Sequence, residues 1–230
     1  MSRRNKLFYV GWDGHQNLGD EVVRLAIQRL LCHRFAFYPK KYTSRVFKLI
    51  PGNVFDVVVL GGGTLINMPA YVHAFRDTPA ASRVVFGTGV ALPEFWNQIP
   101  EHSQHLQEWI ALINQADYVG VRGPLSASQL REWGVQALIN VIGDPALYFA
   151  EAKVQAKVGR RVLGVSEDST KNLLWGDSDE TFWDGLLEQL ETLGECGWSF
   201  VLFPVMPGDA LFAELASERL RKYSVRTAEN

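Results

Sequence analysis

The residues best suited to chemistry lie in the segment GWDGHQNLGDE, at positions 11 to 21, directly after the apolar stretch 7–10. An imidazole can act as a general acid, carboxylates and amides can bind hydroxyl groups, and an indole can stack on a sugar ring. A strand that ends here and a helix that begins here would place these groups where open α/β sheets bind ligands. We therefore take His15 and Asn17 as candidate ligand contacts, and Trp12 as a ring that could stack on a sugar. The alternative is a plain glycine turn followed by a helix that Asp20 caps.

The same segment argues against a dinucleotide site of the usual kind. Its glycines, at positions 11, 14 and 19, do not follow the GxGxxG spacing. Acidic residues at the start of a helix also repel a bound pyrophosphate.

A second glycine-rich segment, VLGGGTLIN at 59–67, also follows an apolar stretch. The backbone amides around Gly62, Gly63 and Thr64 can hold an anion or a sugar hydroxyl. A tight strand-to-helix crossover that needs small residues is the alternative.

A third segment, VRGPLSASQL at 121–130, places Arg122 between a predicted strand and a helix that Pro124 opens. A guanidinium at this position can clamp a carboxylate or a phosphate through paired hydrogen bonds, so Arg122 is a catalytic candidate. Ser126, in the first turn of that helix, caps it or binds an anion beside Arg122. The alternative for Arg122 is an ion pair with Asp144, at the end of the neighbouring strand, which is also a candidate substrate contact.

The elements that position these residues follow an alternating pattern of short apolar strands and amphipathic helices. Such a pattern predicts an α/β protein with a doubly wound parallel sheet. Expected strands are 6–11, 35–38, 56–60, 83–88, 118–122 and 140–142, with helices at 20–32, 105–115 and 124–133. After a polar and basic linker at 151–161, strands 161–166 and 198–204 alternate with helices 180–196 and 210–223. We therefore expect an N-terminal domain over 1–152 and a partial C-terminal domain over 160–230.

The composition sets broad limits on function. A chain of 230 residues with 47% hydrophobic content and a net charge of −2 is a folded protein with no overall attraction for nucleic acid. The N-terminal apolar stretch is too short for a signal peptide or a membrane span, which predicts a cytoplasmic protein. The two cysteines, Cys32 and Cys196, are expected to be buried free thiols, and no metal-binding cluster is apparent.

The ordered series of motifs resembles the polysaccharide pyruvyl transferase family. The segments that carry the resemblance are GWDGHQNLGDE, VVLGGGTLI, FGTGVAL, ADYVGVRGPLSASQLREWGV, VIGDPAL, RVLGVSEDS and FVLFPVMPGD. They cover nearly the whole chain, from residue 7 to about residue 209.

The resemblance implies two Rossmann-like domains arranged as in B-type glycosyltransferases, with the acceptor on the N-terminal side and the donor on the C-terminal side. It also implies transfer of a pyruvyl group from phosphoenolpyruvate to a hydroxyl pair of a sugar, forming a ketal in a cell-surface polysaccharide or exopolysaccharide. It implies no metal or other cofactor. The implied chemistry needs a general acid, for which His15 and His73 are the candidates, with His15 taken as the catalytic one. Asn17, Asp20 and Glu21 match the family's first loop and are expected to contact the acceptor or to shape its pocket. A lipid-linked saccharide acceptor would bring peripheral association with a membrane.

One departure from the family concerns the second domain. Family members usually carry an Arg-Leu-His segment there, and this sequence has none before it ends at SVRTAEN. The resemblance therefore predicts a shortened second domain without that part of the donor site, and exposed apolar edges that favour self-association. Two other functions stay open: a non-catalytic carbohydrate- or nucleotide-binding homologue or fragment, and a nucleotide-sugar glycosyltransferase.

Overall fold

The chain divides into two compact units, each described here by itself. The computed structural model describes residues 5–31, 35–39, 54–92, 105–150, 159, 161–167 and 179–228. Unit 1 comprises residues 1–15 and 19–150, and unit 2 comprises residues 16–18 and 151–230.

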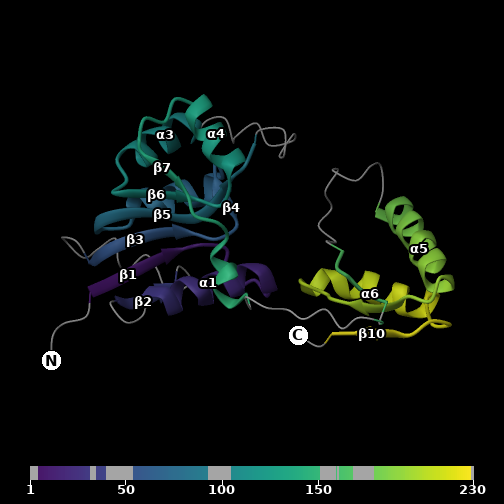
Figure 1. Cartoon of the computed structure of the whole chain (residues 1–230). Coiled ribbons are helices and arrows are strands. Elements are labelled where there is room, and N and C mark those ends of the chain that lie inside the picture. Colours follow the sequence, from purple (N-terminus) through teal and green to yellow (C-terminus); the bar gives the residue numbers. More distant parts are fainter. Residues whose placement is uncertain are drawn as a thin grey trace. The chain divides into compact units, whose positions relative to one another are not determined.

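Unit 1 is built on a parallel sheet whose order is β2-β1-β3-β5-β6-β7, with β4 pairing to β5 (Figure 1). The strands are β1 (Asn5–Val10), β2 (Phe35–Pro39), β3 (Phe55–Gly61), β4 (Thr64–Ile66), β5 (Ala80–Val90), β6 (Tyr118–Val121) and β7 (Ile139–Val141). The predicted α/β class with parallel strands is confirmed.

The strand order places a topological switch point between β1 and β3. Without the short β4, the strands run 2-1-3-4-5-6 in chain order, as in flavodoxin-like sheets, and differ from the classical dinucleotide-binding order 3-2-1-4-5-6. The helix that follows β1 lies on one face of the sheet, and the helix that follows β3 lies on the other face. The loops that follow these two strands therefore lie at the position where open α/β sheets bind ligands.

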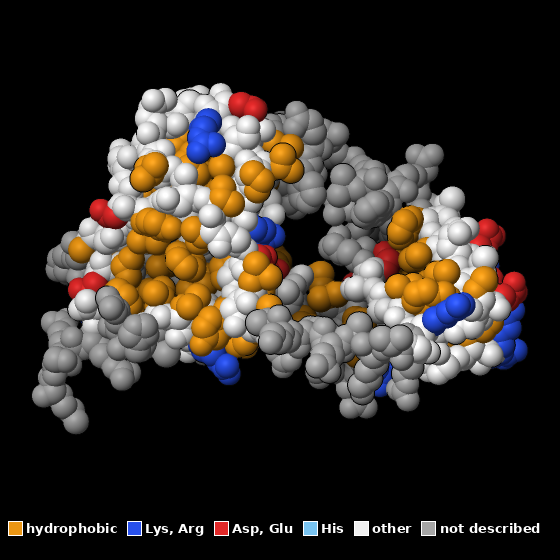
Figure 2. All heavy atoms as spheres, in the orientation of Figure 1, with side chains coloured by type: hydrophobic (Ala, Val, Ile, Leu, Met, Phe, Trp, Pro, Cys, Tyr) orange, Lys and Arg blue, Asp and Glu red, His pale blue; other side chains and the backbone are white. Residues whose placement is uncertain are grey.

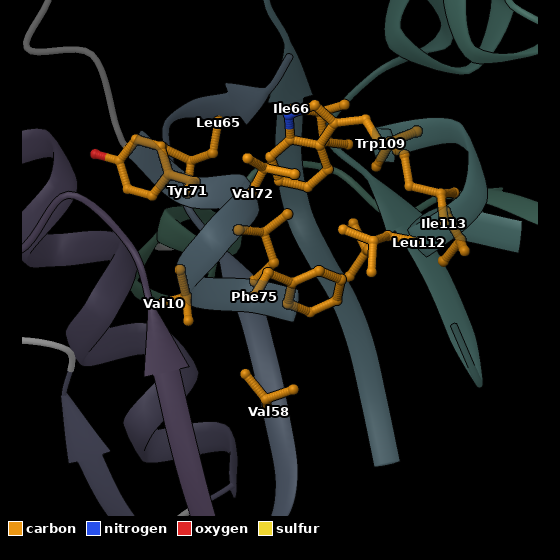
Figure 3. Close-up of a cluster of buried hydrophobic side chains, with 14 of the residues drawn as sticks. Val10, Val58, Leu65, Ile66, Tyr71, Val72, Phe75, Trp109, Leu112 and Ile113 are labelled. Carbon is orange, nitrogen blue, oxygen red and sulfur yellow. The ribbon is translucent and has the colours of Figure 1, made fainter. Parts of the chain in front are cut away.

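Helices cover both faces of this sheet. Helix α1 (Leu18–Leu31) packs Val23 and Ile27 against Tyr9 and Val59 on one face. The other face carries α2 (Pro69–Asp77), α3 (Leu106–Asn114) and α4 (Pro124–Glu132), and a short 3₁₀ helix, η5 (Pro145–Phe149), follows β7. On the α2 and α3 side, Tyr71, Val72, Phe75, Trp109, Leu112 and Ile113 gather over Val10 and Val58 (Figure 3). This apolar layer is the main stabilising contact between helices and sheet.

Two elements of unit 1 were not expected from the sequence. Strand β4 follows the triple glycine directly, and α2 begins at Pro69 and buries Tyr71, Val72 and Phe75. Proline is favoured in the first turn of a helix, and this spacing places the three side chains on one face. The run is too short to predict a helix with assurance before its packing partner is known.

Unit 2 has a small parallel sheet of order β10-β9-β8, formed by β8 (Val162–Val165), β9 (Ser199–Leu202) and β10 (Val225–Thr227). Helix α5 (Asp179–Glu195), the 3₁₀ helix η7 (Pro207–Asp209) and α6 (Ala210–Arg219) accompany it. Its core contains Leu187, Leu190, Phe200, Leu202, Phe212, Ala216 and Leu220. The helix expected over 210–223 is found as α6, which ends earlier, at Arg219. The expectation of only two strands is wrong, because the chain then adds β10.

The side chain of Cys196 is exposed, so the expectation that it is a buried thiol is wrong. Cys32 lies outside the described residues. Most of the predicted linker at 151–161 also lies outside them. No helix in the described part of the chain is both long and apolar enough to cross a bilayer. Figure 2 shows hydrophobic side chains gathered over the sheet of unit 1, while the basic side chains on the same face are scattered.

Candidate active site

The loop between β1 and α1 is closed by a carboxylate from the helix. The backbone N–H of Gly14 donates to Oε1 of Glu21 at 2.5 Å, and Oε2 of Glu21 lies 3.1 Å from Nε of Arg24. Gly14 adopts a φ of 80°, which glycine tolerates far better than other residues. Because α1 begins at Leu18, Asp20 lies in its first turn, and the prediction that Asp20 is the N-cap is wrong.

Two rings of the same loop stack on each other. The centroids of Trp12 and His15 lie 3.9 Å apart with an interplanar angle of 16°. Trp12 remains 39% exposed, so part of the indole is open to a ligand. Asn17 is half-buried and belongs to the short stretch, residues 16–18, that groups with unit 2.

The glycine loop after β3 packs tightly against α1. Gly62 and Gly63 have φ angles of 77° and 51°. A Cβ on Gly62 would lie 2.8 Å from Cγ1 of Val23, and one on Gly63 would lie 3.1 Å from Oδ1 of Asp20. Gly62 is buried, while Gly63 and Thr64 are half-buried. The missing side chain at Gly63 therefore lets the loop approach the carboxylate of Asp20.

Thr88, a residue that we did not single out from the sequence, anchors this loop to β5. Its buried hydroxyl accepts a hydrogen bond from the N–H of Leu65 at 3.2 Å, and the N–H of Gly89 donates to the carbonyl of Gly63 at 2.9 Å. The carbonyl of Thr88 also accepts the N–H of Arg122 at 3.0 Å. Thr88 thus links the glycine loop to the end of β6.

Arg122 and Asp144 form the ion pair that the sequence offered as an alternative. Nε of Arg122 lies 3.1 Å from Oδ2 of Asp144, and the two side chains are 36% and 31% exposed. The other oxygen of Asp144, Oδ1, accepts the N–H of Ala146 at 2.9 Å and so caps η5. Ser126 uses its hydroxyl to accept the N–H of Val90 at 3.3 Å, which ties α4 to the end of β5.

The electrostatics of Asp20 show which predicted residues the fold brings together. Burial raises the pKa of Asp20 to about 6, and the nearby charge of Arg122 opposes this rise. Glu21 and Asp144 add to the rise through like-charge repulsion, and His15 opposes it. Residues from α1, the first loop and the ends of β6 and β7 therefore share one electrostatic environment.

Two buried tyrosines, Tyr9 and Tyr71, lie within electrostatic range of Asp13 and Asp20, and the sequence analysis did not single them out. The hydroxyl of Tyr9 donates to the carbonyl of Gly61 at 2.7 Å. Burial and the charges of Asp13 and Asp20 raise the pKa values of both Tyr9 and Tyr71 well above the ordinary value. Asp13 is only 6% exposed. Tyr9 and Tyr71 resemble ordinary core aromatics in the sequence, so nothing there distinguishes them.

The arrangement combines an exposed aromatic ring, a held guanidinium and a carboxylate that titrates close to neutral pH. These groups can stack on a sugar, bind an anion and move a proton. Within the described residues, no group of three or more His, Cys, Asp or Glu side chains is placed to hold a metal ion. His73 lies on α2 against the ring of His105, at a centroid distance of 5.2 Å.

Comparison with known proteins identifies the family. A family profile described as polysaccharide pyruvyl transferase matches residues 17–212. No curated protein matches the chain. The solved structures that resemble it include a functionally uncharacterized protein from Klebsiella pneumoniae subsp. pneumoniae NTUH-K2044, with 14% sequence identity and a TM-score of 0.49 over 98% of this chain and 84% of that chain. Because the family profile spans most of the sequence, the chain belongs to the polysaccharide pyruvyl transferase family.

Proposed function

We propose that this protein transfers a pyruvyl group from phosphoenolpyruvate to two hydroxyl groups of a saccharide destined for a cell-surface polysaccharide or exopolysaccharide, forming a ketal. The family match supports the reaction class. The observation that carries the proposal is the position of Arg122, a half-exposed guanidinium held at the carboxyl edge of the sheet beside a titrating carboxylate.

Arg122 is suited to bind an anionic group of phosphoenolpyruvate. Its backbone N–H donates to the carbonyl of Thr88 in β5, and its Nε lies 3.1 Å from Oδ2 of Asp144 in an ion pair. A guanidinium carries five N–H donors and can bind a carboxylate or a phosphate through paired hydrogen bonds. A cation held in this way lowers the cost of negative charge that develops on the departing phosphate.

The acceptor saccharide has a matching surface in the first loop. The exposed part of Trp12 offers an apolar face to a sugar ring, and His15 supports the indole from its other side. The carboxylates of the adjacent helix turn can accept hydrogen bonds from sugar hydroxyls. We therefore assign the acceptor to the β1–α1 loop and the donor anion to Arg122.

Calorimetric titration of the full chain with phosphoenolpyruvate tests this function. We expect the wild-type protein to bind, and Arg122→Ala to weaken binding by about 10- to 100-fold, the usual cost of a lost charge-assisted hydrogen bond. Arg131→Ala is the matched control, because Arg131 is exposed in the last turn of the same helix. Absence of binding to the wild-type chain, or equal binding by Arg122→Ala, would contradict the proposal.

A further inference from the structure

We infer that Glu21 is a positioning residue for the acceptor saccharide, which acts through the loop between β1 and α1 without touching the sugar. It fixes the part of the loop that carries Trp12 and His15, and so holds the stack of these two rings as a surface for a sugar ring. This role rests on the proposed assignment of the acceptor to the same loop, and it names the residue that prepares the loop for binding.

The carboxylate of Glu21 connects the loop to its helix through both of its oxygens. Oε1 accepts the backbone N–H of Gly14 at 2.5 Å, and Oε2 accepts a hydrogen bond from Nε of Arg24 at 3.1 Å. Hydrogen bonds to a charged group are stronger than those between neutral groups. Only 27% of the Glu21 side chain is exposed, so water competes weakly for these bonds. We call Gly14, Glu21 and Arg24 together the Glu21 bridge.

The helix end of the Glu21 bridge is held in place by α1. Nη1 of Arg24 donates to Oε1 of Gln28 at 3.2 Å, one turn further along the helix. Side chains three and four positions apart are neighbours on a helix surface, so Glu21, Arg24 and Gln28 form one row on α1. The Arg24 side chain is only 21% exposed. The bridge therefore has a fixed base on the helix, and its Gly14 end belongs to the loop.

The backbone of the loop has a conformation that needs such support. Gly14 has a φ of 80°, which glycine adopts readily, but Gln16 has a φ of 59°, which is uncommon for a residue with a side chain. A strained residue of this kind persists only where the surrounding structure fixes it, and such residues are frequent at ligand-binding sites. The Glu21 bridge fixes the chain two residues before Gln16.

Gly14 also lies between the two stacked rings in the sequence. The rings of Trp12 and His15 lie 3.9 Å apart and nearly parallel, although the residues are three positions apart. For such side chains to stack, the backbone between them must bend, and Gly14 lies in that bend. Loss of the Glu21 bond would free the bend, so a bound sugar would have to order the indole at a cost in affinity. The Glu21 bridge should therefore affect binding of the acceptor and leave binding of the donor unchanged.

Kinetics with and without the indole separate this role from a direct contact. Phosphate release from phosphoenolpyruvate is followed with a panel of methyl hexopyranosides as acceptors. We expect Glu21→Ala to raise the KM of the acceptor about 10-fold, the scale of an aromatic contact, with an unchanged Kd for phosphoenolpyruvate by calorimetry. Glu21→Gln keeps an oxygen that can accept the Gly14 N–H and should stay within about threefold of the wild type. In Trp12→Ala, adding Glu21→Ala should change the KM by less than about twofold, because both act through the same ring. A 10-fold rise that persists in Trp12→Ala would overturn the positioning role.

Fluorine NMR of protein labelled with 5-fluorotryptophan observes the stack without turnover. Trp12→Phe identifies the Trp12 signal, and the other tryptophan signals show that each variant is folded. We expect Glu21→Ala to move the Trp12 signal in the same direction as His15→Ala, which removes the stacked ring. Glu132→Ala, at an exposed glutamate in the last turn of α4, is the matched control and should leave the signal in place. An unmoved Trp12 signal in Glu21→Ala would overturn the role of Glu21. A wild-type chain that shows the expected signals but releases no phosphate would overturn the proposed function instead.

Discussion

Nε of Arg122 lies 3.1 Å from Oδ2 of Asp144, and this ion pair joins the ends of two neighbouring parallel strands beside Asp20. The pair presents opposite charges to one titrating carboxyl group. Arg122 and Asp144 therefore shift the pKa of Asp20 in opposite directions, which substitution of each residue can test.

We predict that Arg122→Ala raises the pKa of Asp20 and that Asp144→Asn lowers it. Loss of the cation disfavours the charged form of Asp20, and loss of the carboxylate favours it. Titration of ¹³C-labelled aspartate side chains by NMR, with Asp20→Asn to assign the signal, measures both shifts. Arg131→Ala should leave the Asp20 signal unmoved, and shifts of the same sign in both test variants would contradict the geometry.

Asp20 should also make stability depend on pH. Its pKa is about 6 in the folded protein against an ordinary value of 3.8, so the folded protein binds more protons than the unfolded chain between these values. The free energy of unfolding therefore falls as pH rises through this window and is level above it. We expect Asp20→Asn to remove this loss and to stabilise the protein at pH 7.5 but not at pH 4.

The size of this effect is limited because Asp20 is only half-buried. After allowance for solvent screening, we expect Asp20→Asn at pH 7.5 to raise the free energy of unfolding by about 1 kcal/mol, or the Tm by roughly 2–4 °C. Thermal unfolding at both pH values provides the measurement. The control is Asp77→Asn, which makes the same change at an exposed residue at the end of α2. An equal Tm change at pH 4 and pH 7.5 in Asp20→Asn, or a rise in Tm only at pH 7.5 in Asp77→Asn, would show that Asp20 is not the group responsible.

Gly87 should tolerate no side chain. Its φ is 71°, and a Cβ would collide with the ring of Pro145 at the start of η5. We predict that Gly87→Ala lowers the free energy of unfolding by about 2–5 kcal/mol, from backbone strain together with overpacking. Gly134→Ala is the matched control, because its φ of 90° brings the same kind of strain with open space around the new methyl group. Chemical denaturation should give a loss of only about 1–2 kcal/mol there, and equal losses at both sites would contradict the close contact with Pro145.

His15 has two candidate roles, support of the Trp12 indole and general acid catalysis, and substitution can distinguish them. If His15 mainly supports the indole, His15→Phe should keep the stack and retain kcat/KM for the acceptor to within about threefold, whereas His15→Ala should lose about 10-fold, the scale of an aromatic contact. Steady-state kinetics with varied acceptor measures both. A loss in His15→Phe as large as in His15→Ala would instead support His15 as the general acid.

Much of the layout could be predicted because it depends on local pattern. Short apolar runs that end at glycine or aspartate became the parallel strands of unit 1, and the amphipathic run after the first loop became α1. Parallel strands place their following loops at one edge of the sheet, which is where the segments around His15, Gly63 and Arg122 lie. The elements that were missed have weak local signals: the short helix α2, and the strands β4 and β10, which have only three residues each.

The sequence by itself determined the family, the α/β class and which polar residues follow the strands, because these depend on residue type and on spacing along the chain. Only the tertiary structure decided the strand order and the partner of each carboxylate. Asp144, the N-cap of η5, forms an ion pair with Arg122, and Glu21 accepts a hydrogen bond from the N–H of Gly14 in the first loop. Asp20 titrates near pH 6 because the fold buries it against a glycine loop and beneath neighbouring charges, and burial and distance are properties of the folded chain alone.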